Sequence, residues 1–253
     1  MKFTDKRFLK LAEKKNVAIK VSFEDEGLDF IDVLTIKKFT LTHNIDLLLK
    51  VAGAEAKRDF KDANKIGVNK IVAPMIESQF AFKKYINSAK QIIKGENTSF
   101  GFNMESKQCY ENIDEILATE EAKILKSITV GRGDLAESFG FDRYHGGVNS
   151  NEIFEITKDT FEKGKLNNLS CYLGGSMNKD SALFCNELIK LNLLDSFETR
   201  NMVFSVAALN EFSFEELIEI AFEFEFEKMN SRRTYYETLY NEDSARLNRL
   251  KTL

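Results

Sequence analysis

Two segments decide the fold: Phe100-Gly-Phe-Asn-Met-Glu-Ser106 and Val130-Gly-Arg-Gly-Asp-Leu-Ala-Glu-Ser138. Each begins as an apolar run and ends at an acid, Glu105 in the first and Asp134 in the second. Apolar runs of this length are typical of parallel strands that are covered on both faces. In an α/β barrel the carboxyl ends of the strands form the mouth where active sites lie. We therefore expect Glu105 and Asp134 to lie at that mouth.

The two acids suit a divalent metal ion. Mg²⁺ and Mn²⁺ prefer oxygen ligands, and Mg²⁺ takes few protein carboxylates and keeps its other positions for water and substrate. Glu105 and Asp134 would supply such a sparse ligand set. The alternative is that each acid caps the helix that follows its strand. Two consecutive units of strand and acid favour the metal site.

Length and composition indicate a single large domain over residues 1–253, since 43% apolar content is enough for a sizeable core. The 36 basic and 40 acidic residues give a net charge of -4, which indicates neither nucleic acid nor a membrane as partner. Three cysteines at unrelated spacings are typical of a reducing compartment. Neither a signal peptide nor an apolar run of about 18 residues is found. We expect a cytoplasmic protein.

Strand-like and helix-like segments alternate along most of the chain. This alternation predicts a parallel (β/α)8 barrel of the TIM type, with one strand hidden and a core over about residues 17–205. The seven strand candidates are 17–23, 45–53, 70–78, 100–106, the run that ends at 134, 169–176 and 196–204.

The C-terminal part has a different character. Ser213-Phe-Glu-Glu216 is a capping box that predicts the start of a helical extension over about 213–253. Phenylalanine falls on more than one face of this helix, including the alternating Phe222-Glu-Phe-Glu-Phe226. Either the barrel or a neighbouring subunit covers those faces, and the second alternative predicts a homo-oligomer.

Several other polar residues accompany the predicted strands. Lys50 interrupts an apolar run, so it must extend to water, pair with an acid or face a polar barrel mouth. Glu77 is a third acid at a strand end. Glu24 and Glu26 either pair with Lys50 or Arg58 or take part in acid/base chemistry.

The last predicted strand and the two histidines add further candidates. Glu198 and Arg200 alternate along 196–204 and would point the same way, either as a substrate site or as a buried salt bridge. His43 precedes a strand and should lie at the structural end of the barrel. His145 lies in the glycine-rich loop after Asp134, where it is either catalytic or a surface residue.

With strands and acids placed, the chain resembles the HpcH/HpaI aldolase and citrate lyase beta-subunit family of the phosphoenolpyruvate/pyruvate barrel superfamily. The segments that carry the resemblance are Ile71-Val-Ala-Pro-Met-Ile-Glu-Ser78, Asn103-Met-Glu-Ser106 and Val130-Gly-Arg-Gly-Asp-Leu-Ala-Glu-Ser-Phe-Gly140. They are similar to the family's apolar-Pro-Met strand, its Glu-Thr strand and its Gly-x-x-Asp-Leu signature. The resemblance covers roughly residues 17–205.

This resemblance implies a class II aldolase or lyase that binds pyruvate or an acyl group at Mg²⁺ or Mn²⁺. By position, Glu105 and Asp134 match the metal ligands, and the backbone from Gly131 through Arg132 to Gly133 would lie close to the substrate carboxylate. The implied mechanism stabilises the enolate that forms when a carbon-carbon bond next to a 2-oxo acid breaks.

The sequence also departs from the family pattern. Lys50 stands where many family aldolases have an arginine, and lysine supplies the charge without the bidentate fork. The family's Glu-His pattern appears here as Glu26-Gly27. We therefore take Lys50, Arg58, His145 and Glu26 as candidate catalytic residues. Gly131, Arg132, Gly133 and Glu77 are the candidate substrate-binding residues.

Three functions are consistent with these observations. The first is a metal-dependent lyase or aldolase that acts on a 2-oxo acid. The second is a relative that uses phosphoenolpyruvate or an acyl-CoA, in which Lys50 and Arg58 would meet a phosphate. The third is a barrel that has lost catalysis and serves as a binding or scaffold protein, which the missing Glu-His pattern favours and the intact pair of Glu105 and Asp134 disfavours.

Overall fold

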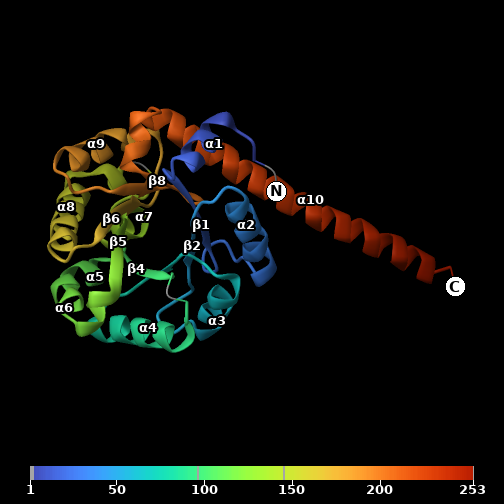
Figure 1. The fold of residues 1–253 in the computed structure, drawn as a ribbon, viewed down its shortest axis with the longest axis horizontal. Coiled ribbons are helices and arrows are strands. Elements are labelled where there is room, and N and C mark those ends of the chain that lie inside the picture. The colour runs from blue at the N-terminus through green and yellow to red at the C-terminus, as the bar shows by residue number, and fades with distance from the viewer. Residues whose placement is uncertain (1–2, 96, 145, 253) are drawn as a thin grey trace.

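Eight strands close into a barrel in sequence order, with helices around them (Figure 1). The computed structural model describes residues 3–95, 97–144 and 146–252. The closed barrel confirms the predicted fold class. The strands are β1 (Val17–Ser22), β2 (Leu47–Lys50), β3 (Lys70–Ala73), β4 (Ser99–Met104), β5 (Leu125–Gly131), β6 (Ser170–Gly174), β7 (Ser196–Glu198) and β8 (Met202–Ser205).

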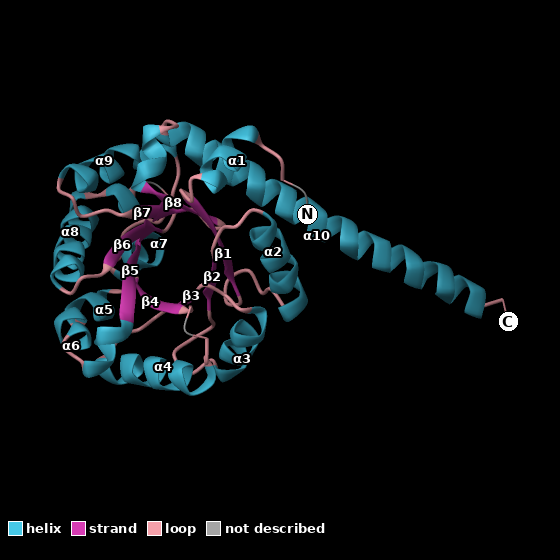
Figure 2. Ribbon diagram, in the orientation of Figure 1, coloured by secondary structure: helices cyan, strands magenta, loops and turns pink. Residues whose placement is uncertain are grey.

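The helices form an outer ring around the strands (Figure 2). Serines cap several of these helices: Ser78, Ser106 and Ser150 each accept a hydrogen bond from a backbone N–H in the first turn of the following helix. The helices are α1 (Lys6–Glu13), α2 (Phe30–Thr42), α3 (Lys57–Ile66), α4 (Gln79–Ile92), α5 (Lys107–Glu111), α6 (Ile113–Leu117), α7 (Arg132–Ser138), α8 (Asn151–Leu166), α9 (Ala182–Lys190) and α10 (Phe214–Leu250). Short 3-10 turns are η1 (Glu120–Ile124), η2 (Gly147–Asn149), η3 (Lys179–Ser181) and η4 (Val206–Asn210).

The eighth strand is antiparallel to both of its neighbours, whereas the pairs from β1 to β7 are parallel. The prediction of one strand over 196–204 is wrong because the chain reverses after Glu198. In the turn, the Thr199 N–H donates to the Met202 carbonyl oxygen at 2.8 Å, and the Met202 N–H donates to Thr199 Oγ1 at 3.2 Å. The strand hidden in the sequence pattern is therefore the second half of this hairpin.

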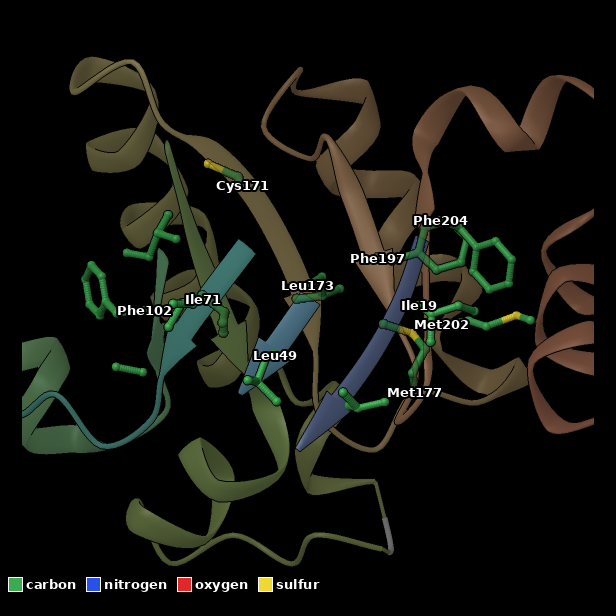
Figure 3. Close-up of a cluster of buried hydrophobic side chains, with 14 of the residues drawn as sticks. Ile19, Leu49, Ile71, Phe102, Cys171, Leu173, Met177, Phe197, Met202 and Phe204 are labelled. Carbon is green, nitrogen blue, oxygen red and sulfur yellow. The ribbon is translucent and has the colours of Figure 1, made fainter. Parts of the chain in front are cut away.

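The apolar core lies between the strands and the outer helices. Alternate residues of the strands, such as Ile19, Leu49, Ile71 and Leu173, are fully buried in one cluster with apolar residues of the helices (Figure 3). Full burial of such a side chain contributes about 1.5–3 kcal/mol relative to leaving it exposed. This outer shell therefore supplies most of the hydrophobic stabilisation of the barrel.

The barrel interior is polar, in contrast to the branched apolar side chains that usually fill TIM barrels. Leu48, Val72 and Val203 are buried but lie outside the apolar cluster, which places their side of each strand toward the barrel axis. On the same side lie Lys20, which pairs in register with Leu48, and Lys70, which also pairs with Leu48. Cavities open at both ends of this interior.

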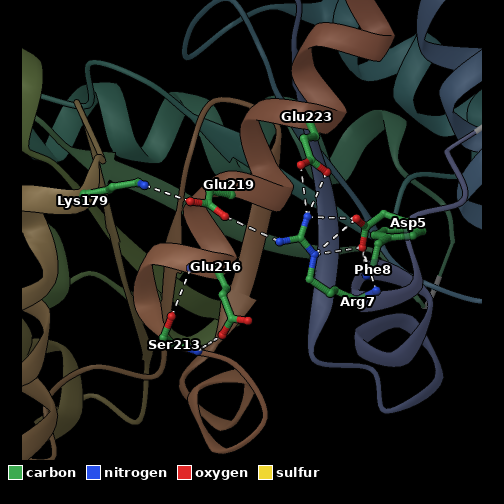
Figure 4. A network of polar contacts seen from close by, with 8 residues as sticks. All are labelled: Asp5, Arg7, Phe8, Lys179, Ser213, Glu216, Glu219 and Glu223. Atoms are coloured by element: carbon green, nitrogen blue, oxygen red, sulfur yellow. Dashed lines mark hydrogen bonds and ion pairs between the residues drawn. The ribbon is translucent and has the colours of Figure 1, made fainter.

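Helix α10 is fixed to the barrel by its N-terminal third and then projects away from it (Figure 1). The capping box predicted at Ser213 is present, with Glu216 as its partner. The Arg7 guanidinium lies 3.0 Å from Asp5, 3.0 Å from Glu223 and 3.6 Å from Glu219, so it ties α10 to the start of α1 (Figure 4). Among the described helices, α10 included, none is long and apolar enough to cross a membrane.

Lys70 generates a prediction about stability. Burial lowers the pKa of Lys70 to about 8, and the charges of Glu198 and Asp46 partly oppose this shift. The unfolded chain keeps this proton up to about pH 10.4, so the free energy of unfolding should rise with pH between about 8 and 10.4 through Lys70. Below pH 8 the buried cation destabilises the fold.

We expect Lys70→Met to be more stable than the wild type at pH 7, by about 1–3 kcal/mol, with the difference shrinking as the pH approaches 10.4. Urea unfolding of both proteins at several pH values measures this. A Lys70→Met protein that is less stable at every pH would show that the ammonium is stabilised where it lies.

Candidate active site

A cavity of about 640 Å³ opens at the carboxyl ends of the strands, and we name it the upper cavity. Lys50, Glu105 and Asp134 all line it, together with Gly131. The closed barrel brings these residues together from the ends of β2, β4 and β5 and the start of α7. The structure thus assembles the two strand-end acids and the interior lysine that the sequence pattern singled out.

Glu105 is a buried carboxylate held on both of its oxygens. Its side chain is only 2% exposed. Oε1 accepts a hydrogen bond from the Met75 N–H at 3.0 Å, and Oε2 accepts one from Asn103 Nδ2 at 2.9 Å. Burial raises the pKa of Glu105, and the nearby charge of Lys50 opposes that shift. The carboxylate is therefore fixed in place at the floor of the upper cavity.

The backbone around Glu105 is shaped to receive it. A Cβ atom on Gly131 would lie 2.8 Å from Glu105 Oε2, so this position of β5 has room only for glycine. Met75, which follows the chain's single proline, has a φ of 49°, in the left-handed region that a methionine rarely adopts. In this conformation the Met75 N–H points at the Glu105 carboxylate and donates a hydrogen bond to it.

Asp134 lies in the first turn of α7 and pairs with Arg143. The Arg143 guanidinium is 3.1 Å from Asp134 Oδ1 and 3.3 Å from Glu137. Asp134 is about one-third exposed at its side chain, so it faces the upper cavity with a cation already beside it. The same arginine lies 2.8 Å from where a Cβ of Gly133 would be, so a side chain at that position would displace the Arg143 guanidinium.

Neither acid caps a helix. Ser106, not Glu105, accepts the capping hydrogen bond of α5. Helix α7 begins after Gly131 without a side-chain cap. The alternative explanation for the two acids, that they serve as helix caps, is therefore excluded by the structure.

Lys50 is the last residue of β2 and lies between two acids. Its Nζ atom is 2.6 Å from Glu24 Oε2 and 4.0 Å from Glu105 Oε2. Burial by itself would lower the pKa of Lys50, but Glu105 and Glu24 outweigh it and raise the pKa above its ordinary value. Lys50 is therefore an ammonium ion at neutral pH and presents a fixed positive charge to the cavity.

Five of the predicted site residues lie outside the lining of the upper cavity: Glu26, Arg58, Glu77, Arg132 and Gly133. Glu26 is buried and accepts hydrogen bonds from the Ser22 N–H at 3.0 Å, from Asn201 Nδ2 at 2.9 Å and from Lys228 of α10. Glu26 thus forms an ion pair with Lys228 and not with the predicted Lys50 or Arg58, whereas Glu24 does pair with Lys50. Arg58 is exposed on α3, and Glu77 is exposed and accepts a hydrogen bond from Ser106 Oγ at 2.7 Å. His145 lies outside the described residues.

The Arg132 side chain is turned away from the upper cavity. It is fully buried, with Nη1 donating to Asn149 Oδ1 at 2.6 Å and Nη2 donating to Ser181 Oγ at 3.0 Å. Its guanidinium carbon lies 4.7 Å from the centre of the Phe184 ring, and burial lowers its pKa to about 10. A substrate-binding role for this side chain does not fit its position, because it holds the loops after β5 and β6 together.

Sequence reasoning overlooked Lys20 and Arg143. Lys20 of β1 forms an ion pair with Glu198 of β7, with β8 between the two strands, and both residues line the upper cavity. Arg200 lies in the turn after β7 and also lines the upper cavity, but its ion-pair partners are Asp25 and Glu225, each at 3.5 Å, and not Glu198. A lysine inside the apolar run of 17–23 was the available signal for Lys20. Arg143 stands in a loop outside any apolar run, so no sequence pattern marks it as a site residue.

The donor set fits a metal ion with few protein ligands. Within residues 3–95, 97–144 and 146–252, no group of three or more His, Cys, Asp or Glu residues could hold a metal. Glu105 and Asp134 are the two acids of the predicted pair, and each faces the cavity with oxygen atoms, the ligand type that Mg²⁺ and Mn²⁺ prefer.

Solved structures with the same fold include members of one enzyme family. An HpcH/HpaI aldolase from Desulfitobacterium hafniense DCB-2 has a TM-score of 0.61 at 13% identity, covering 87% of this chain and 90% of that one. An HpcH/HpaI aldolase/citrate lyase family protein from Burkholderia cenocepacia J2315 has a TM-score of 0.60 at 14% identity, with 78% and 83% covered. The citrate synthase SbnG has a TM-score of 0.56 at 14% identity, with 71% and 76% covered. At these identities the likeness shows the fold.

The sequence itself carries the family assignment. No curated protein sequence matches the chain. The family model described as HpcH/HpaI aldolase/citrate lyase matches residues 39–182, more than half of the 253 residues, and this segment includes Lys50, Glu105 and Asp134. The chain belongs to the HpcH/HpaI aldolase/citrate lyase family.

Proposed function

We propose that this member of the family is a divalent-metal-dependent carbon-carbon lyase or aldolase that acts on a 2-oxo acid through a pyruvate-type enolate. The observation that carries the proposal is the buried Glu105 carboxylate, which lines the same cavity as Asp134 and Lys50. Glu105 and Asp134 would hold Mg²⁺ or Mn²⁺. When bound, such an ion would act as a Lewis acid toward the substrate's carboxylate and keto oxygens.

The protein's own residues supply position and charge. Glu105 is held by two hydrogen bonds, so a ligand oxygen is available without rearrangement of β4. Lys50 places an ammonium ion beside the acids, where negative charge would develop on the keto oxygen, and a preorganised charge of this kind stabilises a transition state. The cavity of about 640 Å³ has the size of a small-molecule site.

Arg143 must change partner for this function. Its guanidinium neutralises Asp134 in the structure, and a bound cation would compete with it for the same carboxylate. Released from Asp134, Arg143 would still line the upper cavity and could meet a substrate carboxylate. The substrate carboxylate would then replace Asp134 as the ion-pair partner of Arg143.

The structure argues against the phosphoenolpyruvate or acyl-CoA alternative, and it contains one observation that favours the scaffold alternative. A phosphate held jointly by Lys50 and Arg58 is disfavoured, because Arg58 is exposed on α3 and does not line the cavity. A barrel that has lost catalysis is favoured by one observation, the ion pair between Arg143 and Asp134, which would close the metal site in a scaffold protein.

Calorimetric titration of metal-free protein with Mn²⁺, with and without oxalate as a mimic of the pyruvate enolate, tests the proposal. We expect oxalate to tighten Mn²⁺ binding, and Glu105→Gln and Asp134→Asn each to weaken it by at least about 10- to 100-fold. Glu77→Gln is the matched control, since it removes a strand-end acid outside the cavity. Wild-type protein that binds neither Mn²⁺ nor oxalate would favour the scaffold alternative.

Lys50 provides a test of the chemistry that does not require the aldehyde or acyl partner. Exchange of the pyruvate methyl protons with D2O in the presence of Mg²⁺, followed by NMR, reports enolate formation. We expect Lys50→Met to slow this exchange by about 10²- to 10³-fold, because a preorganised charge is lost. Lys61→Met, on the exposed side of α3, should exchange at the wild-type rate. Equal rates in both variants would remove Lys50 from the mechanism.

We further propose that the chain is a homo-oligomer in which the projecting part of α10 pairs with that of a second copy. Exposed apolar residues follow this helix at alternating spacings of three and four, the pattern of a coiled-coil seam. The seam is completed by two charged residues, Arg233 and Asp243. Its apolar members are Phe226, Met229, Tyr236, Tyr240, Leu247 and Leu250.

An antiparallel arrangement makes this seam self-complementary. If residue 238 lies on the two-fold axis, Arg233 of each copy faces Asp243 of the other. The apolar pairs are then 226 with 250, 229 with 247 and 236 with 240. An isologous contact of this kind closes into a dimer. A parallel arrangement would instead set arginine against arginine and aspartate against aspartate.

Charge exchange tests this pairing. We expect Arg233→Asp and Asp243→Arg each to weaken self-association by at least about tenfold, because like charges then meet in the seam. The double variant Arg233→Asp/Asp243→Arg should restore the wild-type association. Analytical ultracentrifugation of the full chain measures all four proteins. A double variant that associates no better than the single variants would exclude the antiparallel seam.

A further inference from the structure

A second cavity opens at the opposite end of the barrel, and we name it the lower cavity. Its volume is about 490 Å³, and its lining shares no residue with that of the upper cavity. Small hydroxyl side chains at the strand ends leave the space open: Ser99, Ser170 and Ser196 begin β4, β6 and β7, and Ser205 ends the antiparallel β8. At this end of a TIM barrel, residues ordinarily serve stability.

The lower cavity is positively charged. Its described lining contains the lysines at 15, 37, 70 and 126 and a single acid, Asp46. Lys37 Nζ donates to the neutral Asn69 Oδ1 at 2.9 Å, and the charge of Asp46 only partly opposes the lowering of the Lys37 pKa by burial. A concave surface with an excess of one charge concentrates ions of the opposite sign. The lower cavity therefore favours anionic ligands.

Lys70 and Lys37 are the two buried lysines of this lining, and only Lys37 has a hydrogen-bond partner among the described residues. Lys70 is 8% exposed, and its Nζ atom lies 3.8 Å from the centre of the Tyr172 ring. No hydrogen bond or ion pair joins this ammonium to any residue in the described part of the chain. An ammonium has three donors, and burying it without acceptors is costly. A ligand that supplied the acceptors would remove that cost.

We propose that the lower cavity binds a small phosphorylated molecule, with its phosphate against the Lys70 ammonium and the hydroxyls of Ser170, Ser196 and Ser205. Lysine acts on phosphate as a point charge, whereas planar carboxylates are recognised best by the fork of arginine, and the described lining contains no arginine. The volume exceeds that of a phosphate ion and lies in the range of small-molecule sites.

The site is independent of the proposed lyase activity. Its residues lie at the amino ends of the parallel strands, and Glu105, Asp134 and Lys50 lie at the carboxyl ends. Failure of the metal and oxalate titrations would leave the lower cavity unchanged. Its own test must therefore detect a phosphate without reference to metal or activity.

Calorimetric titration of the full chain with inorganic phosphate and with pyrophosphate, at constant ionic strength in chloride, provides that test. We expect both anions to bind the wild type, and Lys70→Met to reduce the affinity at least tenfold. Ala18→Leu is a second variant, because Ala18 lines the cavity and a larger side chain would fill it without changing its charge. It should also abolish binding, so the outcome does not depend on one substitution.

Two lysine variants serve as matched controls. Lys50→Met removes a buried ammonium from the upper cavity, and Lys61→Met removes an exposed one from α3. Both should bind phosphate as the wild type does. Loss of binding in Lys50→Met alone would place the phosphate in the upper cavity and overturn the proposal. Equal binding by all variants, or no binding by the wild type, would also overturn it.

Discussion

Charge inside the barrel is the constraint on which the rest of this structure depends. Lys20, Lys50 and Lys70 point into an interior that apolar side chains fill in most TIM barrels. Removing an ion from water costs several kcal/mol unless a partner and hydrogen bonds compensate. Lys20 pairs with Glu198 and Lys50 with Glu24, so each lysine at the upper end has an acid. The interior cannot close around these groups, and a cavity remains at each end.

The apolar shell outside the barrel compensates for this polar interior. Its side chains pack between strands and helices, on the side of each strand opposite the interior lysines. This separation lets the site at the upper end hold unfavourable features: a buried carboxylate at Glu105, a methionine at positive φ beside it, and a glycine in β5 where the carboxylate leaves no room for a side chain. Helix α10 adds further stabilisation through the contacts of Arg7.

Sequence reasoning succeeded where the signal was local. An acid at the end of an apolar run is visible in the chain at Glu105 and Asp134, and a charge within such a run is visible at Lys50. Regular alternation likewise predicted the barrel, since seven strands have helices or long loops between them. The hairpin of β7 and β8 was hidden because its strands have only three and four residues and lie three residues apart, so that together they have the length of one ordinary strand.

It failed where the contact depends on tertiary structure. Arg132 lies within the family's signature segment, yet its guanidinium is buried against Phe184 and bonded to loops more than ten residues away. Arg143 gave no pattern at all. Lys20 and Lys70 carry the same signal as Lys50, a lysine in an apolar strand, but Lys70 opens its strand, where a lysine is ordinary. Only the closed barrel shows that Lys70 points inward and that the lower end of this barrel is as polar as the upper end.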